Sequence, residues 1–194
     1  MHAHITRRHE AIVIGVSAGG LAVLRTLLGS LCPGFSLPVI IVQHEARDAG
    51  DFLPRYLNEH CAVRVKQAEE KERILPGTVY LAPPGYHLLV EYDTTFSLSL
   101  DEPVNYARPS IDVLFETAAE VYGPGLVGVV LTGANTDGAA GLKKIKDAGG
   151  LAIVQDPETA EVGSMPRAAI RATAVDHVLP LERIGPLLNE LSRH

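Results

Sequence analysis

The sequence predicts an α/β fold: a doubly wound, mostly parallel sheet with helices on both faces and one antiparallel hairpin. The first observation is a set of short runs rich in Val and Ile, a pattern typical of strands buried on both faces of a parallel sheet. The second is that amphipathic helical segments alternate with these runs along the chain. The third is that three of the runs lead into residues of catalytic type, which are Ser17, His44 and Asp137.

The elements are expected in regular alternation. The first helix should bury leucines at helical spacing from Leu21 to Leu31 and end at Pro33 and Gly34. A later helix opens in the segment RPSIDVLF, where Ser110 is the expected N-cap. The expected strands are residues 11–16, 38–43 and 62–68, one in LPGTVYL, the hairpin 87–92 and 96–101, then 126–132, 151–155 and VDHVL. Further helices are expected at 50–60, after Asp137, at MPRAAIRAT and at ERIGPLLNEL.

The composition bounds the class of protein. With 194 residues, 46% hydrophobic and 21% charged, the chain suits one globular domain, expected at 11–194 after a polar arm at 1–10. The net charge of −6 argues against a nucleic-acid partner. No run is apolar enough for a membrane span or a signal peptide, so we expect a cytoplasmic protein without membrane insertion. The two cysteines, Cys32 and Cys61, lack zinc-binding spacing.

Ser17 lies in a GxSxG pattern, residues 15–19, between an expected strand and an expected helix. A nucleophile elbow needs this context, because the glycines permit a sharp turn and the helix N-terminus offers N–H groups to a developing oxyanion. The backbone N–H of Ala18 is one expected oxyanion donor, and a second is expected in the 133–136 turn, at Ala134. A glycine-rich turn that is purely structural, or that holds a phosphate, is the alternative.

His44 and Asp137 complete the parts of a nucleophilic hydrolase. A histidine at the end of a strand can take the serine proton near neutral pH, or it can simply meet solvent there. Asp137 precedes Gly138 and an expected helix, where Asp is a favoured N-cap that would hold the carboxylate at the edge of the sheet. The order Ser, His, Asp along the chain differs from the Ser, Asp, His order of α/β-hydrolases, so a different topology is expected.

Four further residues are candidates for lining a substrate cleft. His87 starts an expected hairpin strand and either lines the cleft or pairs within the hairpin. Arg108 and Arg167 each adjoin a proline at a loop–helix junction, where they can bind a carboxylate or remain surface charges. Met165, at the start of a short expected helix, is the fourth candidate.

Together these segments resemble the catalytic domain of the CheB family, the chemotaxis protein-glutamate methylesterases, from residue 11 to residue 191. The resemblance implies a nucleophile at Ser17, a base at His44 and an orienting carboxylate at Asp137. It also implies hydrolysis of glutamate γ-methyl esters on chemoreceptor cytoplasmic domains, deamidation of particular receptor glutamines, and no metal or cofactor. The matching segments, in family order, are IGVSAGG, VIIVQH, LPGTVYLAPPGYHL, RPSIDVLF, VVLTGANTDGAAGL, GLAIVQDPETA and SMPRAAI.

The chain departs from the family pattern at three places. Well-studied members carry an N-terminal receiver domain, whereas only residues 1–10 precede the first expected strand here. The chain is therefore expected to be either a standalone member or an excised catalytic domain, and a separate receiver protein stays open as regulator. The loop LTGANTDG (131–138) lacks a common Met and Gly. Ala18 replaces a threonine of some members, and Glu45 follows the histidine where Met is common. Two alternatives stay open: a hydrolase of the same fold acting on another ester or amide, and a non-catalytic nucleotide-binding or scaffold module.

Overall fold

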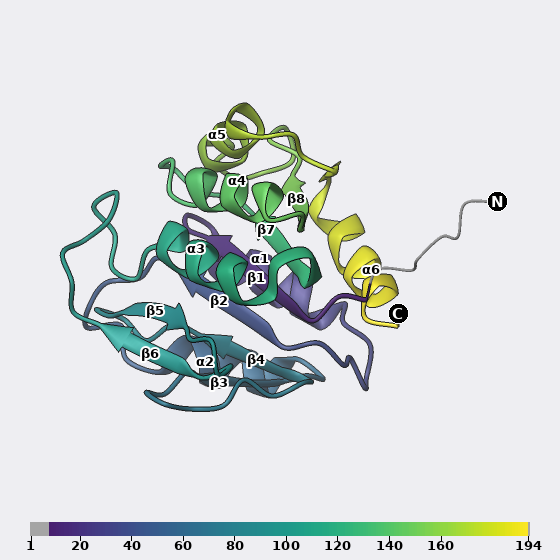
Figure 1. Cartoon of the computed structure of the whole chain (residues 1–194). Coiled ribbons are helices and arrows are strands. Elements are labelled where there is room, and N and C mark those ends of the chain that lie inside the picture. Colours follow the sequence, from purple (N-terminus) through teal and green to yellow (C-terminus); the bar gives the residue numbers. More distant parts are fainter. Residues whose placement is uncertain (1–7, 194) are drawn as a thin grey trace.

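A computed structural model describes residues 8–193, and its centre is a parallel sheet of seven strands (Figure 1). The neighbouring strands all run parallel, in the order β3-β4-β2-β1-β7-β8-β9. Val and Ile dominate the central strands because helices cover both faces of the sheet. The strands are β1 (Ala11–Val16), β2 (Val39–Gln43), β3 (Arg64–Gln67), β4 (Thr78–Leu81), β7 (Leu126–Val130), β8 (Leu151–Gln155) and β9 (His177–Leu179).

Strand β1 lies between β2 and β7, and this arrangement places the candidate site. In the register of the sheet, Val16 lies opposite Gln43 of β2, and Gly15 lies opposite Val130 of β7. The three strands therefore end at the same edge of the sheet. The crevice beyond the carboxyl ends of such strands is where ligands bind in open α/β sheets.

Helices cover both faces of the sheet, and the antiparallel hairpin adds to one of them (Figure 1). Helices α1, α2 and α6 pack on one face, while α3, α4, α5 and the separate antiparallel hairpin pack on the other. This arrangement confirms the predicted doubly wound fold with one hairpin. The helices are α1 (Gly20–Gly29), α2 (Phe52–His60), α3 (Ile111–Tyr122), α4 (Ala139–Asp147), α5 (Ser164–Ala172) and α6 (Leu181–Leu191), and the hairpin is β5 (His87–Val90) with β6 (Phe96–Ser99).

Alternate side chains of each central strand enter different hydrophobic layers. Val13 of β1 belongs to the layer that contains Phe115 of α3, whereas Ile14 belongs to the layer that contains Leu24 of α1. All four side chains are fully buried. Burial of one such side chain stabilises the fold by about 1.5–3 kcal/mol, so the two layers hold the sheet edge in place from both sides.

Helix α1 differs from its prediction in two respects. Leu21 is 41% exposed, and Val23 is buried in its place. Leu21 belongs to the first turn of the helix and lines a groove at the edge of the sheet, beyond the reach of the core. The helix also ends at Gly29 rather than at Pro33 and Gly34.

Most of the N-terminal arm predicted at 1–10 falls on residues 1–7, which lie outside the described residues. Glu10 is already tied to the fold, since its amide donates to the carbonyl of Gly125 at 2.9 Å just before β1 begins. Among the helices of residues 8–193, none is long and apolar enough to cross a membrane.

Candidate active site

Ser17 and His44 lie at the carboxyl edge of the sheet, each one residue beyond its strand. The hydrogen-bond ladder continues through both residues. The Ser17 amide donates to the carbonyl of Thr132 (2.9 Å), and the His44 amide donates to the carbonyl of Val16 (3.1 Å). The chain then turns into α1 at Gly19, whose φ of 77° is readily adopted only by glycine. The sheet itself therefore fixes the backbone that carries the serine and the histidine.

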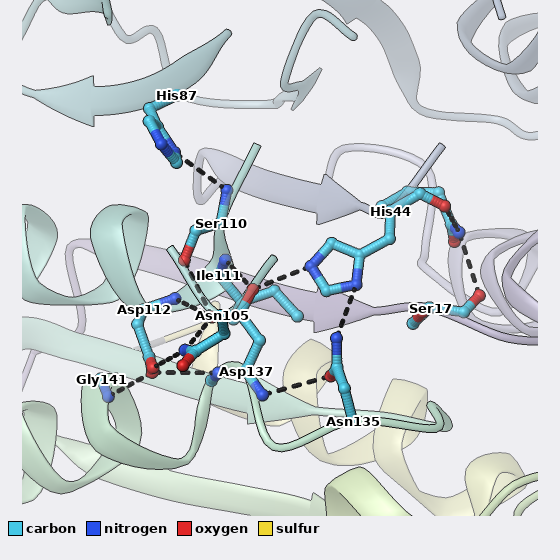
Figure 2. Close-up of polar contacts among 12 residues, drawn as sticks. Ser17, His44, His87, Asn105, Ser110, Ile111, Asp112, Asn135, Asp137 and Gly141 are labelled. Carbon is cyan, nitrogen blue, oxygen red and sulfur yellow. Dashed lines mark hydrogen bonds and ion pairs between the residues drawn. The ribbon is translucent and has the colours of Figure 1, made fainter. Parts of the chain in front are cut away.

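The imidazole of His44 is paired with Asp137, which comes from the loop after β7 (Figure 2). Nε2 of His44 lies 2.8 Å from Oδ2 of Asp137, and the two side chains are 14% and 0% exposed. When the ring is neutral and the carboxylate is ionised, Nε2–H donates a hydrogen bond to Asp137 and Nδ1 keeps a lone pair. Nδ1 is therefore the nitrogen that can accept a proton from a nucleophile.

Asp137 is kept ionised by the donors around it. Burial raises the pKa of Asp137, but the hydrogen bonds to its carboxylate, with His44 first among them, outweigh burial and set the pKa below its ordinary value. An ionised carboxylate at this position can stabilise an imidazolium. The other donors are the amides of Ile111 (2.7 Å) and Asp112 (3.1 Å), the hydroxyl of Ser110 (2.8 Å) and the side-chain amide of Asn105 (3.2 Å).

Asp137 caps a different helix from the one that the sequence predicts. Its carboxylate accepts the first two amides of α3 instead of those of α4, the helix that follows it. Helix α4 is capped in return by Asp112 of α3, whose Oδ1 accepts the amides of Gly138 (2.9 Å) and Gly141 (2.7 Å). Ser110 occupies the predicted N-cap position, but its hydroxyl donates to Asp137. Burial raises the pKa of Asp112, and the neighbouring charge of Asp137 adds to this rise.

Nδ1 of His44, the ring nitrogen that does not contact Asp137, faces Asn135 (Figure 2). Nδ2 of Asn135 lies 3.5 Å from Nδ1 of His44, and Oδ1 of Asn135 accepts the amide of Asp137 (3.2 Å). Within residues 8–193, no hydrogen bond joins Oγ of Ser17 to His44. The structure thus brings His44 and Asp137 together but leaves the serine–histidine link unmade, and this link is often loose before substrate binds. Sequence reasoning noted the altered 134–136 loop without assigning Asn135 a contact.

Gln43, the last residue of β2, ties the serine loop to the histidine loop. Its Nε2 donates to the carbonyls of Ser17 (3.0 Å) and His44 (2.9 Å). Gly20 leaves room for this side chain, since a Cβ there would lie 1.5 Å from Oε1 of Gln43. Sequence reasoning missed this residue. The available signal was a polar side chain inside an apolar strand, immediately before His44.

A family model described as CheB methylesterase matches residues 12–188, nearly the whole described chain. The chain belongs to the CheB methylesterase family. The crystal structure of the Thermotoga maritima CheB methylesterase catalytic domain matches it with a TM-score of 0.91 at 35% identity, over 94% of this chain and 98% of that one. Family and fold therefore agree with the expectation drawn from the sequence motifs.

Relatives in the CheB methylesterase family differ in length. A protein of Leptospira interrogans, named a putative protein-glutamate methylesterase/protein-glutamine glutaminase, is 59% identical over 187 residues, which is 96% of each chain. A protein of Geobacter metallireducens, named protein-glutamate methylesterase/protein-glutamine glutaminase 4, is 40% identical. That match covers 98% of this chain and 55% of the Geobacter protein, so this chain spans about half of that relative.

The two predicted oxyanion donors have unengaged N–H groups in this CheB-family site. Among the described residues, the backbone N–H groups of Ala18 and Ala134 donate to no acceptor. Ala18 follows Ser17 directly, and Ala134 follows Gly133, where a Cβ would lie 3.0 Å from Cβ of Ser17. Both alanines therefore adjoin the serine, and their role as oxyanion donors stays a prediction.

Two open grooves flank His44. One has a volume of about 440 Å³ and is lined by His44, Asn135 and residues 103 and 105–109. The other, of about 530 Å³, contains Ser17 and the first turn of α1. Of the cleft candidates, Arg108 lines the first groove, and its Nη1 donates to the carbonyls of residues 100 (2.6 Å) and 101 (2.8 Å).

The other three cleft candidates line neither groove. His87 is 1% exposed, and its ring nitrogens contact the carbonyl of Glu102 (3.1 Å) and the amide of Ser110 (3.2 Å), so it supports the start of α3 from behind. Met165 is 1% exposed and packs beneath residue 133 because its side chain fills an apolar gap there. Arg167 lines neither groove, and its guanidinium forms an exposed ion pair with Glu158 (2.7 Å).

Proposed function

We propose that this chain hydrolyses glutamate γ-methyl esters on a protein substrate, through an acyl-enzyme formed on Ser17. The observation that carries this proposal is the His44–Asp137 pair, 2.8 Å apart, at the strand edge that also bears Ser17. Membership of the CheB methylesterase family supports the ester chemistry, as do the names of the Leptospira and Geobacter relatives.

The first half of the reaction acylates the serine. Oγ of Ser17 rotates toward Nδ1 of His44, gives up its proton and attacks the γ-carbonyl carbon. Asp137 holds Nε2–H and stabilises the imidazolium that forms. The N–H groups of Ala18 and Ala134 donate to the oxyanion. His44 then returns the proton to the departing methoxide, so methanol leaves and a glutamyl ester of Ser17 remains.

Water completes the cycle. His44 takes a proton from a water molecule, whose oxygen attacks the glutamyl ester, and the proton then passes to Oγ of Ser17 as it leaves. The product is a free glutamate side chain. With ammonia instead of methanol as the leaving group, the same steps deamidate a glutamine. The glutaminase activity in the relatives' names supports this second reaction for the present chain.

The proposed substrate is the helical cytoplasmic domain of a methyl-accepting chemoreceptor, and the chain then acts in the cytoplasm. The groove of about 440 Å³ beside His44 is open, which suits a side chain that projects from a protein surface. A separate receiver protein that regulates the chain stays a prediction.

Methanol release from a purified receptor domain, methylated beforehand, tests this function. Wild-type chain should release methanol, and Ser17→Ala should lower kcat by about 10⁴-fold or more, because the nucleophile is gone. Ser36→Ala is the matched control, since this serine is exposed and lies in a groove away from the strand edge. Near-normal release by Ser17→Ala would refute the nucleophile, and no release by the wild type would refute the substrate.

A further inference from the structure

A two-residue turn at the rim of the His44 groove carries an unfavourable residue. The backbones of Val104 and Ala107 exchange two hydrogen bonds (3.1 and 2.9 Å), and the two residues between them have φ values of 51° (Asn105) and 62° (Tyr106). Two positive φ values define a type I′ turn, which favours Asn followed by Gly. Asn suits its position, but a side chain as large as that of Tyr costs about 1–2 kcal/mol in a left-handed backbone.

The ring of Tyr106 offsets none of this cost by packing within the chain. Its exposed fraction is 104%, so it buries nothing against the described residues. A strained residue of this kind persists when its surroundings fix the backbone, and it is a reason to look for a function.

Hydrogen bonds connect this turn to the candidate active site. Asn105 donates through Nδ2 to Asp112 (2.9 Å) and to Asp137 (3.2 Å), which Figure 2 shows beside it. On the other side, Arg108 binds the two carbonyls that precede the turn. The segment 103–108, hereafter the flap, is therefore held at a fixed position relative to the catalytic carboxylate.

The flap also presents an apolar edge. Tyr106 lines the groove that contains His44, and it projects from the rim into solvent. Val104 of the flap is also exposed (37%), as is Leu100, which precedes the flap (65%). A fully exposed ring at the rim is poorly placed to hold a small molecule within the groove, whereas a folded protein whose ester reaches His44 must lie against the rim.

We propose that the flap docks the helical protein that carries the ester, with Tyr106 as the anchor against an apolar stretch of that helix. This inference rests on the proposed function and adds the surface that selects a protein over a small ester. Tyrosine is enriched among the residues that dominate binding energy, because its ring offers a large contact area at low entropic cost.

Tyr106→Gly tests this proposal, because it creates the Asn-Gly pair that this turn prefers and so keeps the flap folded. We expect kcat/KM for the methylated receptor domain to fall about ten-fold more than kcat/KM for a small activated ester. Tyr92→Gly is the matched control, since this tyrosine is 77% exposed in the β5–β6 turn and lies outside both grooves. Tyr92→Gly should leave kcat/KM unchanged for both the methylated receptor domain and the small ester.

A binding measurement separates this proposal from the proposed function. In the Ser17→Ala background, the Kd for the methylated receptor domain should rise about ten-fold on Tyr106→Gly. Equal losses on receptor and small ester, or an unchanged Kd, would overturn the docking role. If the wild type releases no methanol from the receptor, the proposed function fails. The change in Kd then decides by itself whether the flap docks the receptor domain. A receptor domain that does not bind at all overturns both.

Discussion

At the scale of single residues, one buried carboxylate supports both the candidate chemistry and the local fold. Asp137 binds the ring of His44, accepts the first amides of α3 and binds Asn105 in the turn of the flap. Each contact uses a lone pair of the ionised group. Loss of that charge therefore weakens the histidine pair, the helix cap and the flap together.

Asp137→Asn is expected to lower kcat by about 10⁴-fold, because the imidazole loses the partner that fixes its tautomer. The variant should also be less stable at pH 7. The pKa of Asp137 in the fold lies below its ordinary value of 3.8, so its contribution to stability is fully present above pH 3.8 and is lost as the pH falls through the folded pKa. We expect thermal unfolding between pH 7 and pH 2 to show that the difference in Tm between the wild type and Asp137→Asn becomes smaller below about pH 4.

Asp147→Asn is the control for this pH series. Its carboxylate lies on α4, is 58% exposed and pairs with Lys143 at the surface, so its replacement should change stability by less than about 0.5 kcal/mol. A stability difference between the wild type and Asp137→Asn that stays constant down to pH 2 would contradict the role given to the ionised carboxylate.

Sequence reasoning reached the serine, the histidine and the aspartate because each follows an apolar strand at a shared sheet edge. It missed the supporting residues, since their partners are distant in the chain. Gln43 binds a carbonyl 26 residues away, Asn105 a carboxylate 32 residues away, and Asn135 an imidazole 91 residues away. No local periodicity encodes such contacts, and only the assembled fold creates them.

At the scale of elements, the start of α3 is inserted between β1 and α4. The side chain of Ile111 fills the space that Gly15 and Gly138 leave open. A Cβ added at Gly15 would lie 2.4 Å from Cγ2 of Ile111, and a Cβ added at Gly138 would lie 2.8 Å from the same atom. Gly15, expected from the GxSxG pattern to ease a turn, thus serves packing instead. Gly141 likewise brings α4 close to α3, which lets Asp112 cap α4.

Gly141→Ala tests this close helix contact. Helix propensity favours the alanine by about 1 kcal/mol, but its Cβ would lie 2.5 Å from Cβ of Phe115 and 3.1 Å from Cα of Asp112, which cannot rotate away. We expect the steric cost to exceed the propensity gain, with net destabilisation of about 1–3 kcal/mol in urea unfolding. Gly29→Ala in α1 meets nothing within 4 Å and should be neutral or stabilising. Equal effects of the two substitutions would contradict the packing argument.

At the scale of the whole molecule, alternation of strands and helices predicts a doubly wound sheet but not the order of its strands. That order depends on the side of the preceding strand on which each crossover connection places the next strand. Local sequence patterns do not record this choice. The consequence is that α6, last in the chain, packs against α1, the first helix. Asn189 of α6 joins the two, since its side chain accepts the amide of Cys32 (2.9 Å) and donates to the carbonyl of Ser30 (2.9 Å).

Asn189→Ala should separate stability from activity. The substitution leaves two partly buried backbone groups unpaired at the end of α1, so we expect a loss of about 1–3 kcal/mol in urea unfolding. Asn189→Asp retains the acceptor for Cys32 but puts a carboxylate against a carbonyl at the negative end of the helix, so it should lose at least as much. The ten residues of α1 span about 15 Å, and this distance separates Asn189 from the serine edge. Hydrolysis of a small activated ester by the folded variants should therefore match the wild type. A fall in kcat without a fall in stability would show instead that the α1–α6 contact acts on the site through the helix.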